Sequence, residues 1–507
     1  MFVGLRAALA VAMLAGFYLL ALGVAGGLVV LEVVALRESP VLGLKLAFFV
    51  VPAVFAILVA LVSIERRRDD IVDGVAITPS QQPRLWALVT ELASRVGTRP
   101  PDEIRVVAAV NAAVVENTRL LGLVVTSRRL YVGAPLLAGL SEQQMASVLA
   151  HELGHYANRD TRLSGVVVTG RDALRRVVTG MSGASDLQGA LAGVFASYAK
   201  VYMRLSSAIC RRQELAADAV SARIAGSAAA ASALRELHVV DFSWTWFLKR
   251  HITTGWAVGY LPRSIFDRFT ELRATPELAP VLADLRAQDP PGGDADPYDS
   301  HPPTLSRVAA IEAIAAPTPA DWPDRPALAL VDDPVPLLDR ALLLAMNGVD
   351  ERKRVDWTNY GHLVIQQHMI AATRPLAQAA GRVRGGQPTL RAVLDALDAG
   401  KLLYLAPVDE DEQTGGPRAR RERARTSVGD ALGLLVNLAL VAAGHGRWDV
   451  DWTGNATLRL TDTGLNDLPD LLAAALADDR DSTDLRAVLV RAGVDLDFQP
   501  IPALINA

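Results

Sequence analysis

The chain begins with two long apolar runs. Residues 7–36 carry a single charged residue, Glu32, and residues 41–64 carry only Lys45. A polar break at residues 37–40 separates the two runs. Each run reaches the roughly 20 residues that a helix needs to cross the hydrocarbon core of a bilayer. The pattern predicts a hairpin of two transmembrane helices, over about residues 10–34 and 41–64, within an N-terminal segment of residues 1–68.

The basic residues at the ends of these runs predict the orientation of the hairpin. Arg6 precedes the first run, Arg66, Arg67 and Arg68 follow the second, and Arg37 lies in the loop between them. Basic residues near membrane spans are retained on the cytoplasmic side. We therefore expect a multi-pass protein of the cell membrane, in contact with the lipid bilayer, whose N-terminus and catalytic region are both cytoplasmic.

Beyond the hairpin, the spacing of apolar residues changes. Leucines three and four positions apart predict an amphipathic helix over residues 83–96, ended by Gly97. Short β-prone runs at residues 104–110, 121–126 and 130–132 predict a small sheet. Helical patterns then dominate to about residue 286, and a β-hairpin over residues 448–461, turning near Gly454-Asn455, is expected in the last third of the chain.

Proline and glycine divide the chain into regions. A stretch rich in proline, glycine and aspartate covers residues 289–299, and a proline-dense stretch covers residues 317–336. The first is typical of a loop and the second of a linker. We therefore predict a mainly α-helical protein with a small β-sheet: the transmembrane hairpin, an α+β domain over residues 69–316, the linker, and a separate, mostly helical cytoplasmic domain of unknown role over residues 337–507.

Composition narrows the classes of function. The 507 residues include 51 basic and 55 acidic side chains, for a net charge of −4, which gives no electrostatic basis for binding nucleic acid. Hydrophobic residues make up 51% of the chain, too many for a disordered protein. Cys210 is the single cysteine, so an internal disulfide and a cysteine-based zinc knuckle are both excluded.

The strongest chemical signal is the segment His151-Glu152-Leu153-Gly154-His155. Ser141 and Gln144, just upstream, form a predicted capping box that starts a helix. On a helix, His151 and His155 are four residues apart and point the same way, so that they can share one metal ion. Glu152 lies beside them, where its carboxylate can reach a metal-bound water.

A catalytic zinc site needs a third protein ligand. Glu214 and Asp218, four residues apart in an alanine-rich helical stretch, begin 59 residues after His155. One of these carboxylates can bind the metal while the other accepts the free ring N–H of a ligand histidine. An exposed pair of this kind without a metal would instead repel.

With these elements in order, the chain resembles the HtpX-like and CAAX prenyl endopeptidase-like membrane zinc metallopeptidases (metallopeptidase family forty-eight, of the gluzincin type). The resemblance covers roughly residues 40–315. It rests on the hairpin, Asn111-Ala112 in a strand region, residues 150–155, Glu214 with Asp218, and His301-Pro302-Pro303 with Arg307.

The resemblance implies a zincin-like catalytic domain that holds one Zn2+ per chain. By matching position it assigns His151, His155 and Glu214 as zinc ligands, Glu152 as the general base, Asp218 as the partner of a ligand histidine, and Asn111, Ala112 and Ala113 as the strand on which substrate lies.

His301 falls in the family's downstream His-Pro element. There it would position the active-site cleft or steady a developing oxyanion. A simpler role for the residue is the cap of a helix that begins at Pro302.

The chain departs from HtpX-like members in its membrane spans. Those members usually have two more spans between the histidine motif and the third ligand, whereas here residues 187–209 are the one candidate, interrupted by Lys200 and Arg204. We predict a long amphipathic helix there, packed against the catalytic region.

The predicted function is that of a membrane-anchored zinc endopeptidase that hydrolyses peptide bonds by a zinc-activated water. The resemblance implies protein or peptide substrates, membrane proteins among them, and a role in membrane-protein quality control. The alternative is a non-catalytic, membrane-anchored scaffold or regulatory protein with a structural or relic zinc site. Glu152 favours the enzyme, because a structural site has no use for a base beside its ligands.

Overall fold

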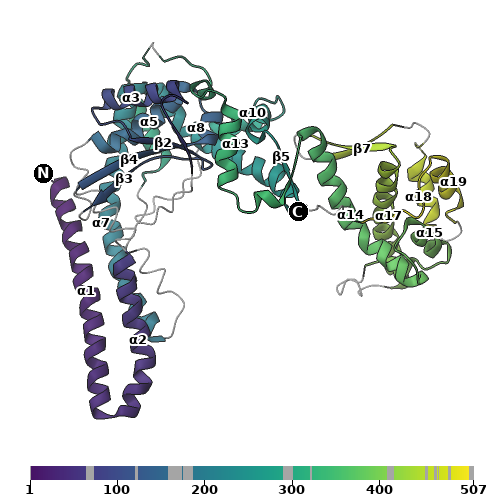
Figure 1. The fold of residues 1–507 in the computed structure, drawn as a ribbon, viewed down its shortest axis with the longest axis horizontal. Coiled ribbons are helices and arrows are strands. Elements are labelled where there is room, and N and C mark those ends of the chain that lie inside the picture. The colour runs from purple at the N-terminus through teal and green to yellow at the C-terminus, as the bar shows by residue number, and fades with distance from the viewer. Residues whose placement is uncertain are drawn as a thin grey trace. The chain divides into compact units, whose positions relative to one another are not determined.

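The computed structural model describes residues 2–63, 74–119, 124–157, 174, 186–288, 301–319, 322–407, 416–451, 455–461, 465, 467–477 and 481–501. The chain groups into two compact units. Unit 1 comprises Met1–Trp244 and Phe266–Asn347, and unit 2 comprises Thr245–Ile265 and Gly348–Ala507. The chain is mainly helical with small sheets, an N-terminal pair of apolar helices and a helical C-terminal region, as the sequence predicts (Figure 1).

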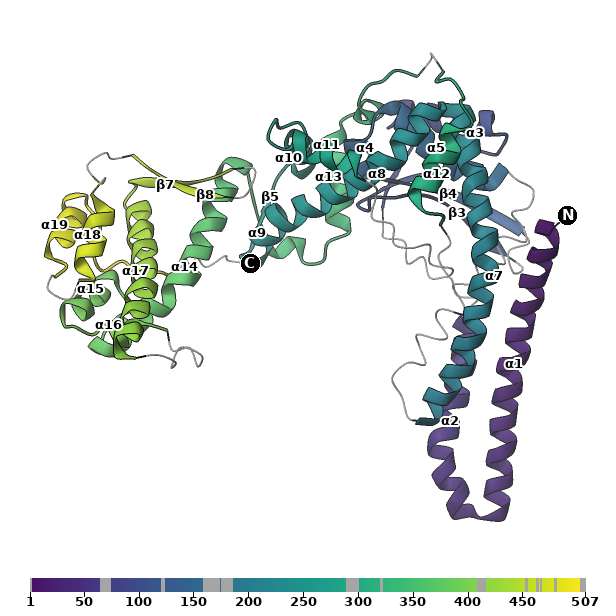
Figure 2. The ribbon, with the colours of Figure 1, turned by 180° about the vertical axis from the view of Figure 1, so that it is seen from behind.

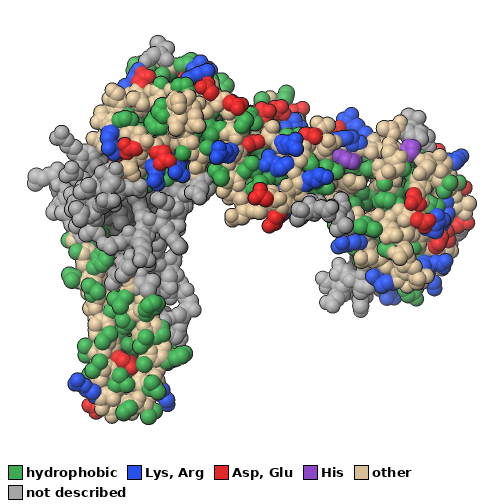
Figure 3. All heavy atoms as spheres, viewed as in Figure 1, with side chains coloured by type: hydrophobic (Ala, Val, Ile, Leu, Met, Phe, Trp, Pro, Cys, Tyr) green, Lys and Arg blue, Asp and Glu red, His purple; other side chains and the backbone are tan. Residues whose placement is uncertain are grey.

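The N-terminal hairpin consists of α1 (Phe2–Glu38) and α2 (Pro40–Ser63), and the predicted polar break between them is confirmed. Most of the exposed large hydrophobic side chains of the described chain belong to these two helices, which Figure 3 shows as a largely hydrophobic surface. The predicted span of residues 10–34 is part of a longer helix. The basic cluster of residues 66–68 lies outside the described residues.

Two helices in the described part of the chain are long and apolar enough to cross a membrane: Ala12–Glu38 within α1, and α17 (Pro417–Ala442). The first supports the membrane assignment. The second has an arginine-rich first half, while Leu432, Leu435 and Val436 of its second half are fully buried in the core of unit 2. We therefore interpret α17 as a core helix. In α2, the apolar stretch Pro40–Phe55 is shorter.

The sheet of unit 1 has the strand order β1-β2-β4-β3, which leaves β3 at an edge. Its strands are β1 (Val75–Ile77), β2 (Glu103–Val107), β3 (Ala112–Arg119) and β4 (Val124–Gly133). Strands β2 and β4 pair in parallel, and β3 pairs with β4 antiparallel.

One detail of the sheet prediction is wrong. The separate runs at residues 121–126 and 130–132 are not two strands, because β4 continues through the polar residues between them. Arg128 forms an ion pair of 2.6 Å with Glu116 of β3, and Arg129 one of 2.9 Å with Glu103 of β2. These partners on both neighbouring strands allow arginines to lie inside the sheet. Residues 120–123 lie outside the described residues.

The helices that carry the predicted chemistry form as expected. Helix α3 (Pro83–Val96) buries Leu85, Leu88 and Leu92 and ends at Gly97, whose φ of 78° is the left-handed conformation that glycine adopts easily. Helix α5 (Glu142–Ala157) starts with the predicted capping box. In it, the Ser141 N–H donates to Gln144 Oε1 at 2.9 Å, and the Gln144 N–H donates to Ser141 Oγ at 3.3 Å.

The long helix predicted over residues 187–209 is part of α7 (Asp186–Ala225), a single helix of 40 residues. Figure 2 shows α7 running beside α1 and on to α5. Near the hairpin, the Tyr198 hydroxyl donates to the Met13 carbonyl at 2.5 Å, and the Tyr198 ring lies 5.9 Å from that of Phe17.

Unit 1 also contains α4 (Ala134–Gly139), α8 (Ser227–Phe247), which runs into unit 2, α10 (Ile265–Arg273), α11 (Ala279–Ala287), α12 (Thr304–Glu312), the short 3-10 turn Ala327–Leu330 and α13 (Pro334–Leu344).

The stretch predicted as a linker, residues 317–336, is grouped with unit 1. Its described part packs on the start of α5: the Glu142 N–H donates to the Arg325 carbonyl at 2.7 Å, and the Ala327 N–H donates to the Leu140 carbonyl at 2.9 Å. The predicted outer limits of the catalytic and C-terminal domains remain predictions.

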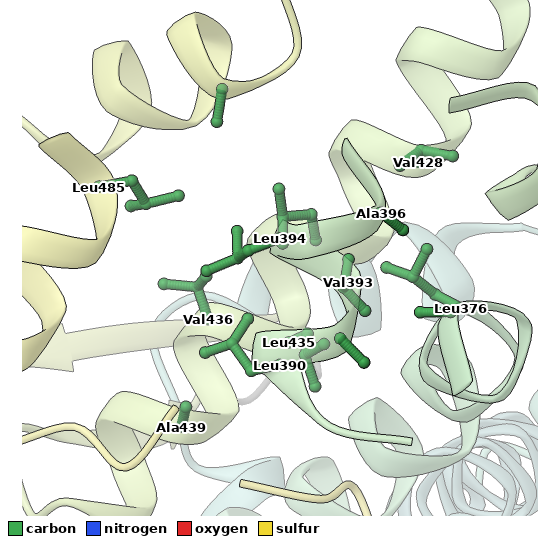
Figure 4. Packing of buried hydrophobic residues seen from close by; sticks show 14 of the residues in the cluster. Leu376, Leu390, Val393, Leu394, Ala396, Val428, Leu435, Val436, Ala439 and Leu485 are labelled. Atoms are coloured by element: carbon green, nitrogen blue, oxygen red, sulfur yellow. The ribbon is translucent and has the colours of Figure 1, made fainter. Parts of the chain in front are cut away.

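Unit 2 is a helical core with two small pairs of strands. Figure 4 shows apolar side chains of α14, α15, α17 and α19 meeting around Val393 and Leu435. Its helices are the π-helical turn Leu248–Ile252, α9 (Thr253–Ala257), the 3-10 turn Val349–Glu351, α14 (Trp357–Arg384), α15 (Leu390–Asp398), α16 (Leu402–Leu405), α17, α18 (Leu468–Ala475) and α19 (Thr483–Arg491); its strands are β5 (Tyr260–Pro262), β6 (Lys353–Val355), β7 (Gly446–Val450) and β8 (Ala456–Leu460). Strands β7 and β8 form the predicted hairpin, and Gly454 of its turn lies outside the described residues.

Candidate metal centre

Helix α5 presents both histidines of the motif on one face. His151 Nε2 and His155 Nε2 are 3.2 Å apart, because residues four apart on a helix lie one above the other. Close packing against α7 holds this face in place. Ser147 Oγ and Ser221 Oγ are 2.7 Å apart, and a Cβ added at Gly154 would lie only 3.3 Å from the Val220 side chain. The glycine inside the histidine motif therefore lets the two helices approach.

Helix α7 brings Glu214 to the two histidines. Glu214 Oε2 lies 3.6 Å from His151 Nε2, and Glu214 Oε1 lies 3.7 Å from His155 Nε2. Two ligand atoms about 2.0–2.1 Å from one ion at tetrahedral angles are separated by about 3.3–3.4 Å. The observed spacings therefore fit a single metal ion. In the described part of the chain, this is the one group of three potential ligands, all within 4.8 Å of one another.

Asp218, one turn further along α7, holds the His151 ring. Its Oδ1 lies 3.0 Å from His151 Nδ1. A carboxylate only accepts, so Nδ1 carries the hydrogen and Nε2 keeps its lone pair for a metal. Arg307 of α12 donates to both oxygens of Asp218, from Nε at 2.8 Å and from Nη2 at 2.7 Å, and its Nη2 lies 3.4 Å from Glu214 Oε2. The guanidinium thus fixes both carboxylates of α7.

The two histidines differ in their affinity for a proton. Burial alone lowers the pKa of His151, but the carboxylates of Asp218 and Glu214 outweigh burial and raise it to about 9. Burial and the neighbouring His151 lower the pKa of His155 to about 4. Although burial opposes it, contact with His151, His301 and Arg307 holds the pKa of Glu214 well below its usual range. Near neutral pH, His155 and Glu214 are therefore already in the form that binds a divalent metal, whereas His151 holds a proton on Nε2 that the metal would displace.

Glu152 lies on α5 between the two histidines in sequence. Burial raises the pKa of its carboxyl to about 7, although the positive charges of His151, Arg307 and His301 oppose the rise. A divalent cation bound nearby would favour the ionised form further. A carboxylate of this kind is suited to take up and release a proton near neutral pH.

His301 also lies at the site. Its Nδ1 is 3.3 Å from Glu214 Oε2, and 60% of its side chain is exposed. The predicted role as a helix cap is wrong, because α12 begins at Thr304 and Pro303 is its N-cap residue, with no capping side chain.

The strand predicted to hold substrate lies beside the histidine helix. Ala112 and Ala113 are the first residues of the edge strand β3, and the exposed Asn111 precedes them. Helix α5 packs against β3, and the Tyr156 hydroxyl, one residue after His155, donates to the Val114 carbonyl.

Sequence reasoning missed the roles of Arg307 and Tyr156. The sequence shows Arg307 only as a residue near the His-Pro-Pro element. Asp218 lies 89 residues earlier in the chain, so no local pattern indicates that the two residues pair. The contact of Tyr156 joins segments 42 residues apart in the chain. Only the path of the chain through space reveals such a contact.

The part of the chain that contains the candidate site is also the part that matches a known protein family. Residues 79–315 match the model of peptidase family M48. The chain is 27% identical over 249 residues to a protease HtpX homolog of Gemmatimonas aurantiaca, which covers 47% of this chain and 78% of that protein. Against the HtpX homolog of a Sulfurihydrogenibium species, the identity is 26% over 253 residues, covering 46% and 75%.

Protease HtpX of Shewanella oneidensis is 31% identical over 183 residues, which is 32% of this chain and 62% of that protein. No solved structure matches the chain with statistical significance. These relatives are proteases by name.

The contact between Asp218 and His151 is expected to strengthen metal binding. Asp218→Asn keeps the shape of the side chain but removes the charge that pairs with His151 and Arg307. Loss of a partner of this kind costs about 10–100-fold in metal affinity. We expect that loss when zinc affinity is measured by competition with a chromophoric chelator. The control is Asp241→Asn, which changes an exposed carboxylate of α8; equal affinities in the two variants would contradict the role of Asp218.

Proposed function

We propose that the chain is a membrane-anchored, zinc-dependent endopeptidase with Glu152 as its general base, because residues 79–315 match the model of peptidase family M48 and the chain is similar to HtpX proteases. The observation that supports this most is the meeting of His151, His155 and Glu214 within 4.8 Å, with Glu152 on the same helix as both histidines. Three protein ligands are typical of a catalytic zinc site, whereas structural sites use four.

A bound zinc ion supplies a Lewis acid that makes a coordinated water more acidic and polarises the substrate carbonyl. The residues of this chain do the rest. The Glu152 carboxylate accepts a proton from the attacking water on one of its oxygens and then delivers it to the nitrogen of the departing amine. Asp218 and Arg307 hold His151 and Glu214 in place, and His301 steadies Glu214 from the exposed side.

Substrate is proposed to lie along the edge strand β3, beginning at Asn111, Ala112 and Ala113. An edge strand has unpaired N–H and C=O groups, and a peptide added to it is held by its backbone with little dependence on sequence. That mode of binding suits an endopeptidase for misfolded or damaged membrane proteins. Membrane-protein quality control is therefore the role we propose.

We further propose that α1 and α2 both cross the cell membrane, with the N-terminus and the metal centre on the cytoplasmic side. The basic residues Arg6, Arg66, Arg67 and Arg68 on one side of the hairpin, against Arg37 on the other, support this orientation.

The enzymatic proposal is tested by zinc content and cleavage of casein, measured on the same detergent-purified samples of wild type, Glu152→Gln and Glu214→Gln. We expect one zinc per wild-type chain. Glu152→Gln should keep its zinc but lose about 10²–10⁴-fold in cleavage rate, because the base is gone and the ligands remain. Glu214→Gln should lose zinc and activity together.

Two results would contradict the proposal. Zinc without cleavage in wild type would favour a non-catalytic scaffold with a structural or relic site. Unchanged cleavage in Glu152→Gln would remove Glu152 from the mechanism.

Orientation is tested with single cysteines placed in a Cys210→Ser background. The two substitutions are Glu38→Cys, at the end of α1, and Ser80→Cys, before α3. Both positions are exposed. A membrane-impermeant maleimide added to intact cells should label Glu38→Cys, whereas Ser80→Cys should be labelled only after lysis. The reverse pattern would show that the orientation is inverted, and equal labelling would show that the hairpin does not span the membrane.

A further inference from the structure

The outward-facing backbone groups of β3 can be identified from its neighbours. The Asp102 N–H donates to the Arg128 carbonyl at 2.8 Å, and the Arg128 N–H donates to Asp102 Oδ2 at 2.7 Å. Both peptide groups of Arg128 therefore face the β2 side of β4. Since backbone groups alternate along a strand, those of Arg129 and Tyr131 face β3.

The pairing register carries this alternation across to the edge. Arg129 is opposite Val115, and Tyr131 is opposite Ala113. Val115 and Ala113 therefore bond to β4, and the N–H and C=O groups of Ala112, Val114 and Glu116 point away from β4. The register shift in this pair of strands lies beyond these residues, between Asn117 and Thr118.

One of these outward-facing carbonyls already has a partner. The Tyr156 hydroxyl donates to the Val114 carbonyl. The Tyr156 ring is held from its other side by Arg128, whose guanidinium carbon lies 4.9 Å from the ring centroid and whose Nη2 pairs with Glu116 at 2.6 Å. Tyr156 follows His155 directly in the chain, so the residue next to a proposed metal ligand makes this contact with β3.

This contact changes what the edge can offer a substrate. A peptide added antiparallel to β3 can exchange two hydrogen bonds with Ala112, because both groups of that residue are turned outward. Opposite Val114, the substrate finds an N–H that has no partner among the described residues, but a carbonyl to which Tyr156 already donates. A carbonyl oxygen has two lone pairs, and the Tyr156 hydroxyl engages this one on the side away from β4, from which the substrate N–H would also have to come.

We propose that Tyr156 determines where backbone recognition of the substrate weakens, by withholding the Val114 carbonyl from the substrate residue opposite it. This inference rests on the proposed function, since it takes β3 as the substrate strand. Tyr156 is then a specificity-determining residue: the peptide is held firmly opposite Ala112 and loosely opposite Val114. The substrate residue opposite Val114 makes no hydrogen bond to that carbonyl, so a change of side chain at this residue costs no such bond.

The test removes substrate N–H donors one at a time. A short labelled casein peptide is made as a series in which single backbone amides, away from the scissile bond, are replaced by esters. Binding is measured by fluorescence anisotropy with the zinc-loaded full chain carrying Glu152→Gln, so that the readout does not depend on turnover. The same series is then measured with Tyr156→Phe added, and with Tyr404→Phe added as a control at an exposed tyrosine of α16.

With Tyr156 present, we expect the ester opposite Ala112 to weaken binding and the ester two residues away, opposite Val114, to have no effect. With Tyr156→Phe, that silent ester should weaken binding about two- to tenfold, the usual worth of one hydrogen bond. The other positions, and the whole series with Tyr404→Phe, should not change.

An identical ester profile with and without Tyr156 would overturn the proposal, as would a uniform loss of binding in Tyr156→Phe, which indicates a structural role only. A series in which no ester matters would overturn it too, since the peptide then does not lie along β3. The ester series measures binding only. The proposed function is tested separately, by casein cleavage with the wild type, and none of these binding results decides it.

Discussion

The close packing of α5 against α7 is the contact on which the candidate site depends. Each helix supplies only part of the donor set, two histidines from one and two carboxylates from the other. The buried serine pair, Ser147 with Ser221, and the small residue Gly154 let the two helices approach until ligand atoms are 3.2–3.7 Å apart. A side chain at position 154 would press on Val220 and push α7, which carries Glu214, away from the two histidines.

Helix α7 also links this site to the apolar hairpin. The same rigid element that carries Glu214 and Asp218 packs at its other end on α1, through Tyr198 against Met13 and Phe17. A helix has little freedom to bend without a proline or glycine defect. The position of Glu214, the proposed third ligand, therefore depends on contacts at the hairpin as well as on contacts at α5.

Sequence reasoning reached those features whose causes are local. The capping box at Ser141, the stop at Gly97 and the pairing of His151 with His155 follow from residues within one or two helical turns, and all three are confirmed. The course of β4 was misjudged, because Arg128 and Arg129 look like a break unless their partners on β2 and β3 are known. The roles of Arg307 and Tyr156 could not be predicted for the same reason, since each depends on a partner distant in the chain.

His151, His155 and Glu214 are proposed to bind one zinc ion together and to leave one coordination position free. The most direct measurement is X-ray absorption at the zinc edge on the detergent-purified full chain. We predict nitrogen and oxygen neighbours at about 2.0–2.1 Å, with the outer-shell scattering of two imidazole rings and no sulfur. A sulfur neighbour at about 2.3 Å, which would have to come from Cys210, or a shell with fewer than two imidazoles would contradict the account.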